Sequence, residues 1–165
     1  MAVLTIMLGV GTRFCASGEN INKTGYKLTE SFMDVTYEIS PQIHNWMLNE
    51  LLMATWREQH QDVDWRPVLK RSLFWVGAYA GKINQLVGFC NVGWDGGKHA
   101  FLLDLTVRPN HQRQGIGTQI VKHAIEQTRA NRMQWLHVDY PPHLAEFYQG
   151  CGFQHTAAGL IDLRK

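Results

Sequence analysis

Cysteine is scarce in this sequence, and neither sign of charge is in large excess. The three cysteines, Cys15, Cys90 and Cys151, are an odd number at spacings that match no disulfide framework, zinc ribbon or thioredoxin motif. A reducing, cytoplasmic setting fits this composition. Lys and Arg number 16 against 14 Asp and Glu, and a net charge of +2 is too small for a protein that coats nucleic acid or an anionic membrane. We therefore expect no nucleic acid and no membrane as partner.

Long hydrophobic runs are also missing. No stretch reaches the roughly 18 apolar residues of a membrane-spanning helix. Residues 1–11 are apolar but lack the basic start and the cleavage site of a signal peptide, so we do not expect secretion. The eight histidines include no pair with zinc-site spacing, so we expect no metal.

The chain length indicates one domain. With 165 residues, of which 45% are hydrophobic, the sequence can bury one sizeable core but cannot supply two domains and a linker. Residues 12–31 are rich in Gly, Asn, Thr and Ser and show neither helix nor strand period. We therefore predict that residues 1–34 are an N-terminal extension outside the main fold, as an added strand, a dimer arm or a misassigned start. Residues 35–165 then form the domain, and a homodimer stays open.

From residue 35 onward, the hydrophobic pattern first predicts strands joined by tight turns. Runs of β-branched and aromatic residues indicate strands at 35–39, 73–80, 85–94 and 100–107, the last apolar enough to be buried on both faces. Ser40 and Pro41 provide an N-cap and a first-turn proline, which predicts a helix from there to about Trp56. Residues 58–65 read as a loop or a broken helix, and Pro67 begins a short helix that ends near Arg71.

In the second half, helices and strands alternate. An apolar stripe at helical spacing predicts a surface helix over residues 115–131, followed by a strand at 134–138, a short helix at 142–150 and one or two strands at 153–163. A crossover helix that joins neighbouring strands makes them parallel. The predicted fold class is therefore α+β. Its mixed central sheet has an antiparallel first half and a parallel pair of core strands, 100–107 and 134–138, flanked by helices.

The most informative segment is the turn between strand 100–107 and the next helix. Gly115 and Gly117 stand where the helix begins, so the backbone can approach a ligand closely while free N–H groups and the helix dipole point at it. Such a turn is typical of a phosphate site, although two glycines can also serve only to pack a helix on a sheet. A dinucleotide fingerprint fails because Ile120 stands at its third small position, and no segment has P-loop spacing.

The same segment resembles the GNAT superfamily of acyl-coenzyme A dependent N-acetyltransferases. The family signature, Gln or Arg, two residues, Gly, one residue, Gly or Ala, is matched at residues 112–117, and the preceding strand end at 105–109 also fits. Residues 145–153 resemble the second signature, in which an aromatic residue and a tyrosine precede a Gly-Phe pair. The resemblance is specific over 100–155, looser over 35–99 and absent over 1–34. One departure is Pro142, where many members carry an asparagine bonded to pantetheine.

The resemblance implies acetyl-coenzyme A as cosubstrate. Main-chain amides of residues 113–118 would hold the pyrophosphate, and the backbone of residues 105–107 would pair with the pantetheine arm. Tyr148 would lie near the thioester sulfur and protonate the leaving thiolate, although Phe147 and Tyr148 taken alone also fit an ordinary pair of core aromatics. The candidate cofactor-binding residues are Leu105, Thr106, Val107, Gln112, Arg113, Gln114, Gly115, Ile116, Gly117 and Thr118.

The implied activity is N-acetyl transfer by direct attack of a primary amine on the thioester, with a main-chain N–H near Leu105 stabilising the oxyanion. The base has several candidates: Asp104, His137, Asp139 and His143. Of these we choose Asp104, whose alternative role is that of a satisfied buried carboxylate. A covalent route through Cys151 is not expected, because a small buried thiol at a helix end explains that residue.

The acceptor is the least specified part of the sequence. Aromatic and acidic side chains together suit a small cation, so a small-molecule amine is the expected partner, and a protein amine stays open. These residues also fit core packing and a solvated loop. The alternative function is a catalytically silent acyl-coenzyme A sensor or interaction module with the same fold. The candidate lining of the acceptor cleft consists of Trp46, Trp56, Glu58, Asp62, Asp64, Trp65, Trp75 and Trp94.

Overall fold

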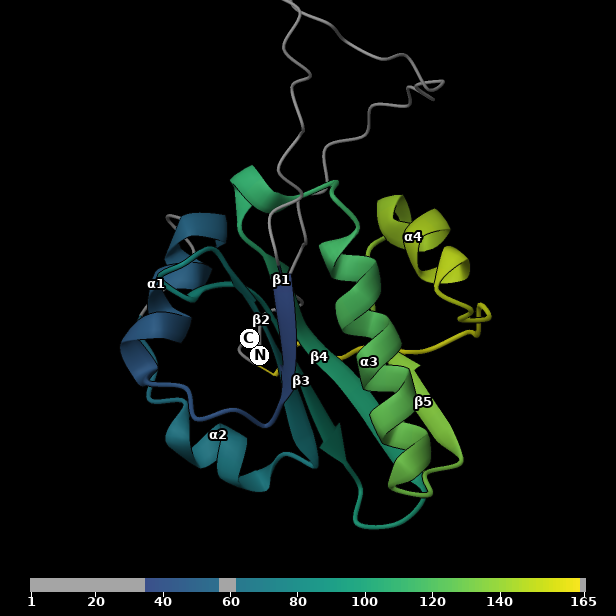
Figure 1. Cartoon of the computed structure of the whole chain (residues 1–165). Helices are drawn as coiled ribbons and strands as arrows, with labels where there is room; N and C mark the ends of the chain where they lie inside the picture. The colour runs from purple at the N-terminus through teal and green to yellow at the C-terminus, as the bar shows by residue number, and fades with distance from the viewer. Residues whose placement is uncertain (1–34, 57–61, 164–165) are drawn as a thin grey trace, which may run out of the picture.

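A five-stranded sheet in the order β1-β2-β3-β4-β5 organises the chain (Figure 1). The structure is a computed structural model that describes residues 35–56 and 62–163. Strands β1 to β4 pair antiparallel, whereas β4 and β5 run parallel, which confirms the predicted fold class. The strands are β1 Val35–Ile39, β2 Phe74–Ala80, β3 Gln85–Trp94, β4 His99–Val107 and β5 Trp135–Val138.

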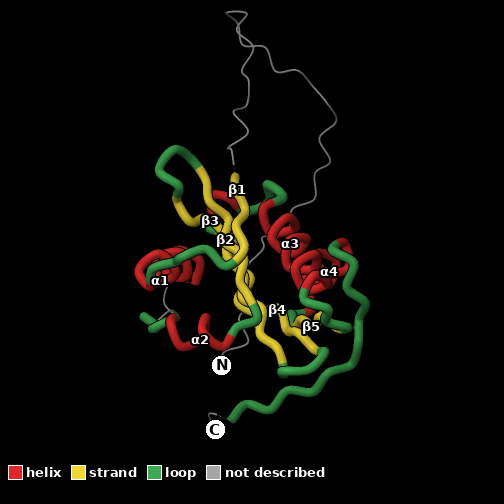
Figure 2. Tube along the Cα trace, turned by 60° about the horizontal axis from the view of Figure 1, so that its bottom comes forward, coloured by secondary structure: helices red, strands yellow, loops and turns green. Residues whose placement is uncertain are grey.

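Helices cover both faces of this sheet. Figures 1 and 2 show α1 and α2 on one face and α3 and α4 on the other. The helices are α1 Asn45–Trp56, α2 Arg66–Arg71, α3 Ile116–Ala130 and α4 Ala145–Gly150, with single 3₁₀ turns at Pro109–His111 and Pro142–Leu144. None of the helices in the described ranges is long and apolar enough to cross a membrane.

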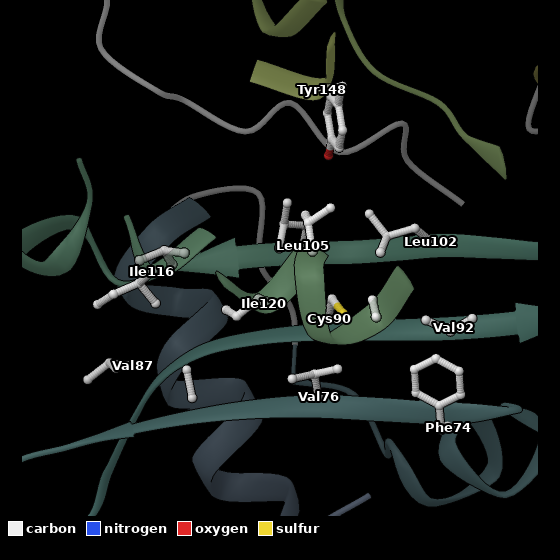
Figure 3. Packing of buried hydrophobic residues seen from close by; sticks show 14 of the residues in the cluster. Phe74, Val76, Val87, Cys90, Val92, Leu102, Leu105, Ile116, Ile120 and Tyr148 are labelled. Atoms are coloured by element: carbon white, nitrogen blue, oxygen red, sulfur yellow. The ribbon is translucent and has the colours of Figure 1, made fainter. Parts of the chain in front are cut away.

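Alternation along the strands produces a separate core on each face. On the face that we call the α3 face, Val76, Cys90, Val92 and Leu105 pack with α3 and with Tyr148 of α4 (Figure 3). On the opposite α1 face, Phe89 and Tyr79 of the sheet pack with buried leucines of α1 and α2. Burying apolar side chains on both faces stabilises the sheet and holds the end of β4 between α1 and α3.

Gly88 on β3 marks the closest approach of α3 to the sheet. A Cβ there would lie 2.6 Å from Ile120 Cδ1 and 3.3 Å from Ala78 Cβ, and Ile120 is fully buried. We expect Gly88→Ala to lower the free energy of unfolding by about 1–3 kcal/mol through overpacking, as measured by urea unfolding. Gly150→Ala, whose Cβ would meet nothing within 4 Å, is the control and should cause no loss. Equal stability of Gly88→Ala and the wild type would contradict this packing.

The first helix begins later than predicted. Ser40 has a φ of 50°, whereas an N-cap residue has extended dihedrals, and its amide bonds to the carbonyl of Trp75, so it continues the pairing of β1 instead of capping a helix. The amides of Met47 and Leu48 both donate to His44 O, so α1 starts at Asn45. Pro41 therefore lies in the connection, and the predicted start at Ser40-Pro41 was wrong.

The predicted strands at residues 153–163 are also wrong. The described residues of this segment form no strand, and Leu160 and Ile161 are 73% and 81% exposed. Ala157, Ala158 and Gly159 have low strand propensity, and β5 remains the edge of the sheet. The prediction that residues 1–34 form an extension concerns residues outside the described ranges.

Candidate active site

The candidate site begins where β4 and β5 separate. Their pairing runs from His99 with Trp135 to Leu102 with Val138, after which β5 ends while β4 continues to Val107. No other strand among the described residues pairs with this side of β4 at residues 103–107. The main-chain N–H and C=O groups of that edge can therefore take an extended ligand as an additional strand. The predicted pantetheine-binding residues 105–107 lie here.

The start of α3 supplies the second part of the site. Its N-cap Gly115 has a φ of 82° and gives no side-chain cap, so the first-turn amides keep the unpaired N–H groups that every helix start has. Arg113 is also left-handed, with a φ of 60°. These conformations turn the chain sharply into the helix, and the amides with the positive end of the helix dipole form a site suited to an anion.

The side chains of two glutamines form hydrogen bonds within this turn. Gln112 donates from Nε2 to Val107 O at 2.8 Å, and Gln114 donates to Asn110 O at 3.1 Å. Both were predicted to contact the cofactor, and the structure uses their side chains to fix the loop that presents the amides. A contact of their main chain with the cofactor stays a prediction.

Tyr148 lies on α4, across the α3 face from β4. Its side chain is 2% exposed and stacks on Tyr140 with ring centroids 4.8 Å apart, and Phe147 and Phe153 contact its edges. Figure 3 shows its hydroxyl pointing toward the strand that carries Leu105. Burial raises the pKa of Tyr148 well above its ordinary value. The phenol is therefore protonated at neutral pH, and the same shift makes it a weaker acid in its free state.

Asp104 lies at an irregularity of β4. Asn91 pairs with Leu103 and Phe89 with Thr106, so β4 carries an extra residue here, and Asp104 takes a φ of 56°. Its partly buried carboxyl accepts a hydrogen bond from the Asn91 side chain. Burial raises the pKa of Asp104, and the bond from Asn91 opposes that rise.

The side chains of the two predicted catalytic residues lie on opposite faces of the sheet. Asn91 pairs with Leu103 on one strand and with Trp75 on the other, and Trp75 packs against the core of the α1 face. Its bond to Asp104 therefore places that carboxyl toward the α1 face, whereas Tyr148 packs on the α3 face. The backbone of Leu105 lies between the two, at the free edge of β4.

The other candidate bases are placed differently. His137 bonds to His99 with 2.8 Å between ring nitrogens and stacks on Phe101, whereas Asp139 and His143 are exposed. Burial raises the pKa of Cys151, so its thiol is not activated as a nucleophile. In the described ranges, no three His, Cys, Asp or Glu side chains gather as metal ligands.

The predicted acceptor lining is only partly available. Trp65 is 7% exposed in the core of the α1 face, and the Asp64 carboxylate is bonded to Arg66 and Asn45. Trp75 donates to Pro41 O, whereas Trp46 is 65% exposed on α1. Glu58 lies outside the described residues. The tryptophans of this set thus divide between packing and surface, which a composition argument cannot resolve.

A cavity of about 840 Å³ lies beside the site. It is bounded by the end of α3, by β5 and by residues 151–160, and its lining includes Cys151 and Tyr140, whose ring stacks on Tyr148. The turn at residues 113–118 and Asp104 do not line it. The cavity is therefore distinct from the anion site at the start of α3.

Comparison with known proteins identifies relatives of this arrangement. Residues 41–153 match the family model described as the acetyltransferase (GNAT) family. No curated protein matches the sequence.

Solved structures share the fold at low identity. A GNAT family acetyltransferase from Streptococcus pneumoniae is 24% identical, with a TM-score of 0.60 over 79% of this chain and 100% of that one. Glucosamine-6-phosphate N-acetyltransferase from Arabidopsis thaliana is 13% identical (TM-score 0.61, 79% and 99% covered). An aminoglycoside acetyltransferase from an uncultured soil sample is 16% identical (TM-score 0.62, 79% and 97% covered). Identities this low support the fold alone.

Proposed function

The chain belongs to the GNAT family of acetyltransferases, and we propose that it transfers an acetyl group from acetyl-coenzyme A to the amine of a small molecule. The observation that carries this proposal is the meeting of three features at the end of β4: its free edge, the uncapped start of α3 and the buried Tyr148. The family generally uses acetyl-coenzyme A as donor. In this chain, residues 35–165 carry the activity.

Each part of the donor has a matching part of the site. The amides of residues 113–118 would hold the pyrophosphate, because they combine free N–H groups with the positive end of the α3 dipole. The main chain of residues 105–107 would pair with the amide groups of the pantetheine arm. This path brings the thioester to the segment of β4 that lies between Tyr148 and Asp104.

The transfer needs one base and one acid. Asp104 takes a proton from the ammonium of the acceptor, and the free amine attacks the thioester carbonyl, so that a C–N bond forms. A main-chain N–H near Leu105 stabilises the oxyanion. The C–S bond then breaks and Tyr148 gives its proton to the leaving thiolate, while the acylated nitrogen loses its second proton, which returns to the Tyr148 phenolate. The products are the N-acetyl amine and coenzyme A, and Asp104 releases its proton to water.

A small amine is the proposed acceptor, in a reducing, cytoplasmic setting. Solved structures with the same fold include enzymes for an aminoglycoside and for glucosamine-6-phosphate, so the fold is compatible with polar, amine-bearing acceptors. An acetyl-transfer screen that measures free thiol release separates aminoglycosides, amino sugars, arylalkylamines and peptide amines. Transfer to peptide amines only would replace the small molecule by a protein acceptor.

Acetyl-coenzyme A is expected to stabilise the protein against heat. A ligand present at a hundred times its Kd adds about 2.7 kcal/mol to the free energy of unfolding, enough to raise Tm visibly. The measurement is thermal unfolding with acetyl-coenzyme A, with coenzyme A that lacks the 3′-phosphate, and with NAD as the control dinucleotide.

The pattern of shifts decides between the two functions. Stabilisation by acetyl-coenzyme A and none by NAD supports the donor site. If millimolar acetyl-coenzyme A leaves Tm unchanged, the donor assignment is wrong. Stabilisation without thiol release in the presence of any amine favours the catalytically silent acyl-coenzyme A module.

A further inference from the structure

We propose that Asn91, on the neighbouring strand β3, is the residue that positions the Asp104 carboxylate as the base for the acceptor amine. This inference rests on the proposed function, because it assigns Asn91 a role in that same reaction. The starting observation is a buried side-chain amide in which only one of the two polar groups has a hydrogen-bond partner. Asn91 is 2% exposed and bonds to Asp104, but its Oδ1 is buried without a hydrogen-bond partner.

The orientation of the amide follows from the chemistry of its partner. A carboxylate can only accept hydrogen bonds, so the Nδ2 group of Asn91 faces Asp104 and Oδ1 turns away. Asp104 stands at the irregularity of β4 with a left-handed backbone, which few residues other than glycine adopt. The irregularity of β4 thus includes the residue whose side chain bonds to Asn91.

The unpaired oxygen argues against a purely structural role. Leaving a buried acceptor unsatisfied is unfavourable, and an apolar side chain of the same shape removes that cost. Leucine has the branching of asparagine and would suit the neighbouring Trp75 of β2, which pairs with Asn91 of β3. For stability alone the position favours leucine, whereas a base that must stay ionised in a partly buried place needs a donor.

Few titratable groups lie near Asp104 in the described part of the chain. Cys90 of β3 interacts with Asp104 electrostatically, and burial raises its pKa to about 12, so it stays neutral. Tyr148 of α4 lies against Cys90 and is also neutral, and Glu50 of α1 is bonded to Arg108 at 3.1 Å. Among these described groups, the Asn91 amide is the one that directly favours the ionised carboxylate.

The first test measures unfolding and needs no catalysis. Losing the bond raises the folded-state pKa of Asp104 further above its unfolded value of about 3.9, so the folded protein holds the proton more tightly. Stability is then lost as pH rises from that unfolded value through the folded one. We expect the Tm of Asn91→Leu to equal or exceed that of the wild type near pH 4 and to fall below it by a growing amount toward pH 8.

Two controls isolate the pair. In the Asp104→Asn background no carboxyl at position 104 titrates, so Asn91→Leu should change Tm equally at every pH. Thr128→Val removes a buried hydroxyl that donates to Ala124 O within α3, and its effect should also be independent of pH. A pH-independent effect of Asn91→Leu in the otherwise wild-type protein overturns the inference.

The second test is the pH profile of acetyl transfer. Asn91→Leu should move the acidic limb of kcat/KM for the amine upward by about one pH unit, with activity recovering at alkaline pH and KM for acetyl-coenzyme A unchanged. Asn91→Asp places a second carboxyl beside Asp104 and should move the limb further, because neighbouring carboxyls share a proton.

The outcomes separate this inference from the function on which it rests. If the wild type acetylates an amine and both variants keep its pH profile, the positioning role of Asn91 is wrong and the proposed function stands. If the wild type transfers to no amine while the pH-dependent coupling in Tm persists, the proposed function fails and the role in catalysis fails with it.

Discussion

Tyr148→Phe is expected to lower kcat by about 100-fold or more while leaving the affinity for acetyl-coenzyme A within about twofold. The substitution removes one hydroxyl from a ring that is 2% exposed and keeps its stacking on Tyr140. General acids contribute about 10²–10⁴-fold in enzymes, and the leaving thiolate would lose its proton donor. Single-turnover acetyl transfer and calorimetric titration with coenzyme A measure the two effects separately.

The neighbouring Tyr140 provides the matched control. Tyr140→Phe removes a hydroxyl from the ring that stacks on Tyr148, and the proposed mechanism assigns that hydroxyl no role. Its kcat should stay within a few-fold of the wild type. Because burial raises the pKa of Tyr148, the wild type should show no loss of activity from deprotonation of this phenol below about pH 10. If Tyr148→Phe and the wild type have equal kcat, the hydroxyl of Tyr148 is not the general acid and the residue serves only for packing.

The sequence suffices for the part of the site that is built from main chain. Gly115 and Gly117 indicate a turn into a helix, and the apolar run before them indicates a buried strand, because these patterns reflect local backbone demands. The structure places both elements within a residue or two of the predicted ends. The predicted antiparallel first half and parallel core pair follow from the same local signals, since hairpins and a crossover helix determine which strands are neighbours.

Contacts between side chains of neighbouring strands cannot be predicted from such local patterns. Asn91 and Asp104 come together because β4 carries an extra residue, which changes the register by one and turns Asp104 toward the α1 face. No periodicity in the sequence indicates where a strand is irregular. An asparagine inside an otherwise apolar strand was the available signal for Asn91, because a buried polar side chain requires a partner.

The prediction of strands at residues 153–163 was wrong for a related reason. Leu160, Ile161 and Leu163 resemble a strand by composition, yet all three are exposed. Strand propensity largely measures how well a side chain packs on a sheet that already exists, so a strand-like sequence beside an edge strand does not require pairing. Trp65 shows the opposite case, because its place in a mostly polar loop hid its burial in the core of the α1 face.

Gly117→Glu is expected to weaken acetyl-coenzyme A binding by about 100-fold or more without unfolding the protein. Gly117 lies in the first turn of α3, where a negative side chain favours the helix itself. The same carboxylate would occupy the positive end of the dipole and repel the pyrophosphate. Two like charges about 4 Å apart interact by about 4 kcal/mol at an effective dielectric constant of 20. Calorimetric titration with coenzyme A and thermal unfolding of the free variant measure both effects.

Two variants at the same position separate bulk from charge. A Cβ at Gly117 would lie 3.6 Å from Phe147 and 3.7 Å from Val107, which are ordinary contacts, so Gly117→Ala should keep the fold and most of the affinity. Gly117→Gln has the length of glutamate without its charge, and should therefore bind more tightly than Gly117→Glu. If Gln and Glu weaken binding equally, the loss is steric and the start of α3 acts by its shape. Wild-type affinity in Gly117→Glu would instead place the pyrophosphate elsewhere, because no anion can share the first turn of a helix with a glutamate and lose nothing.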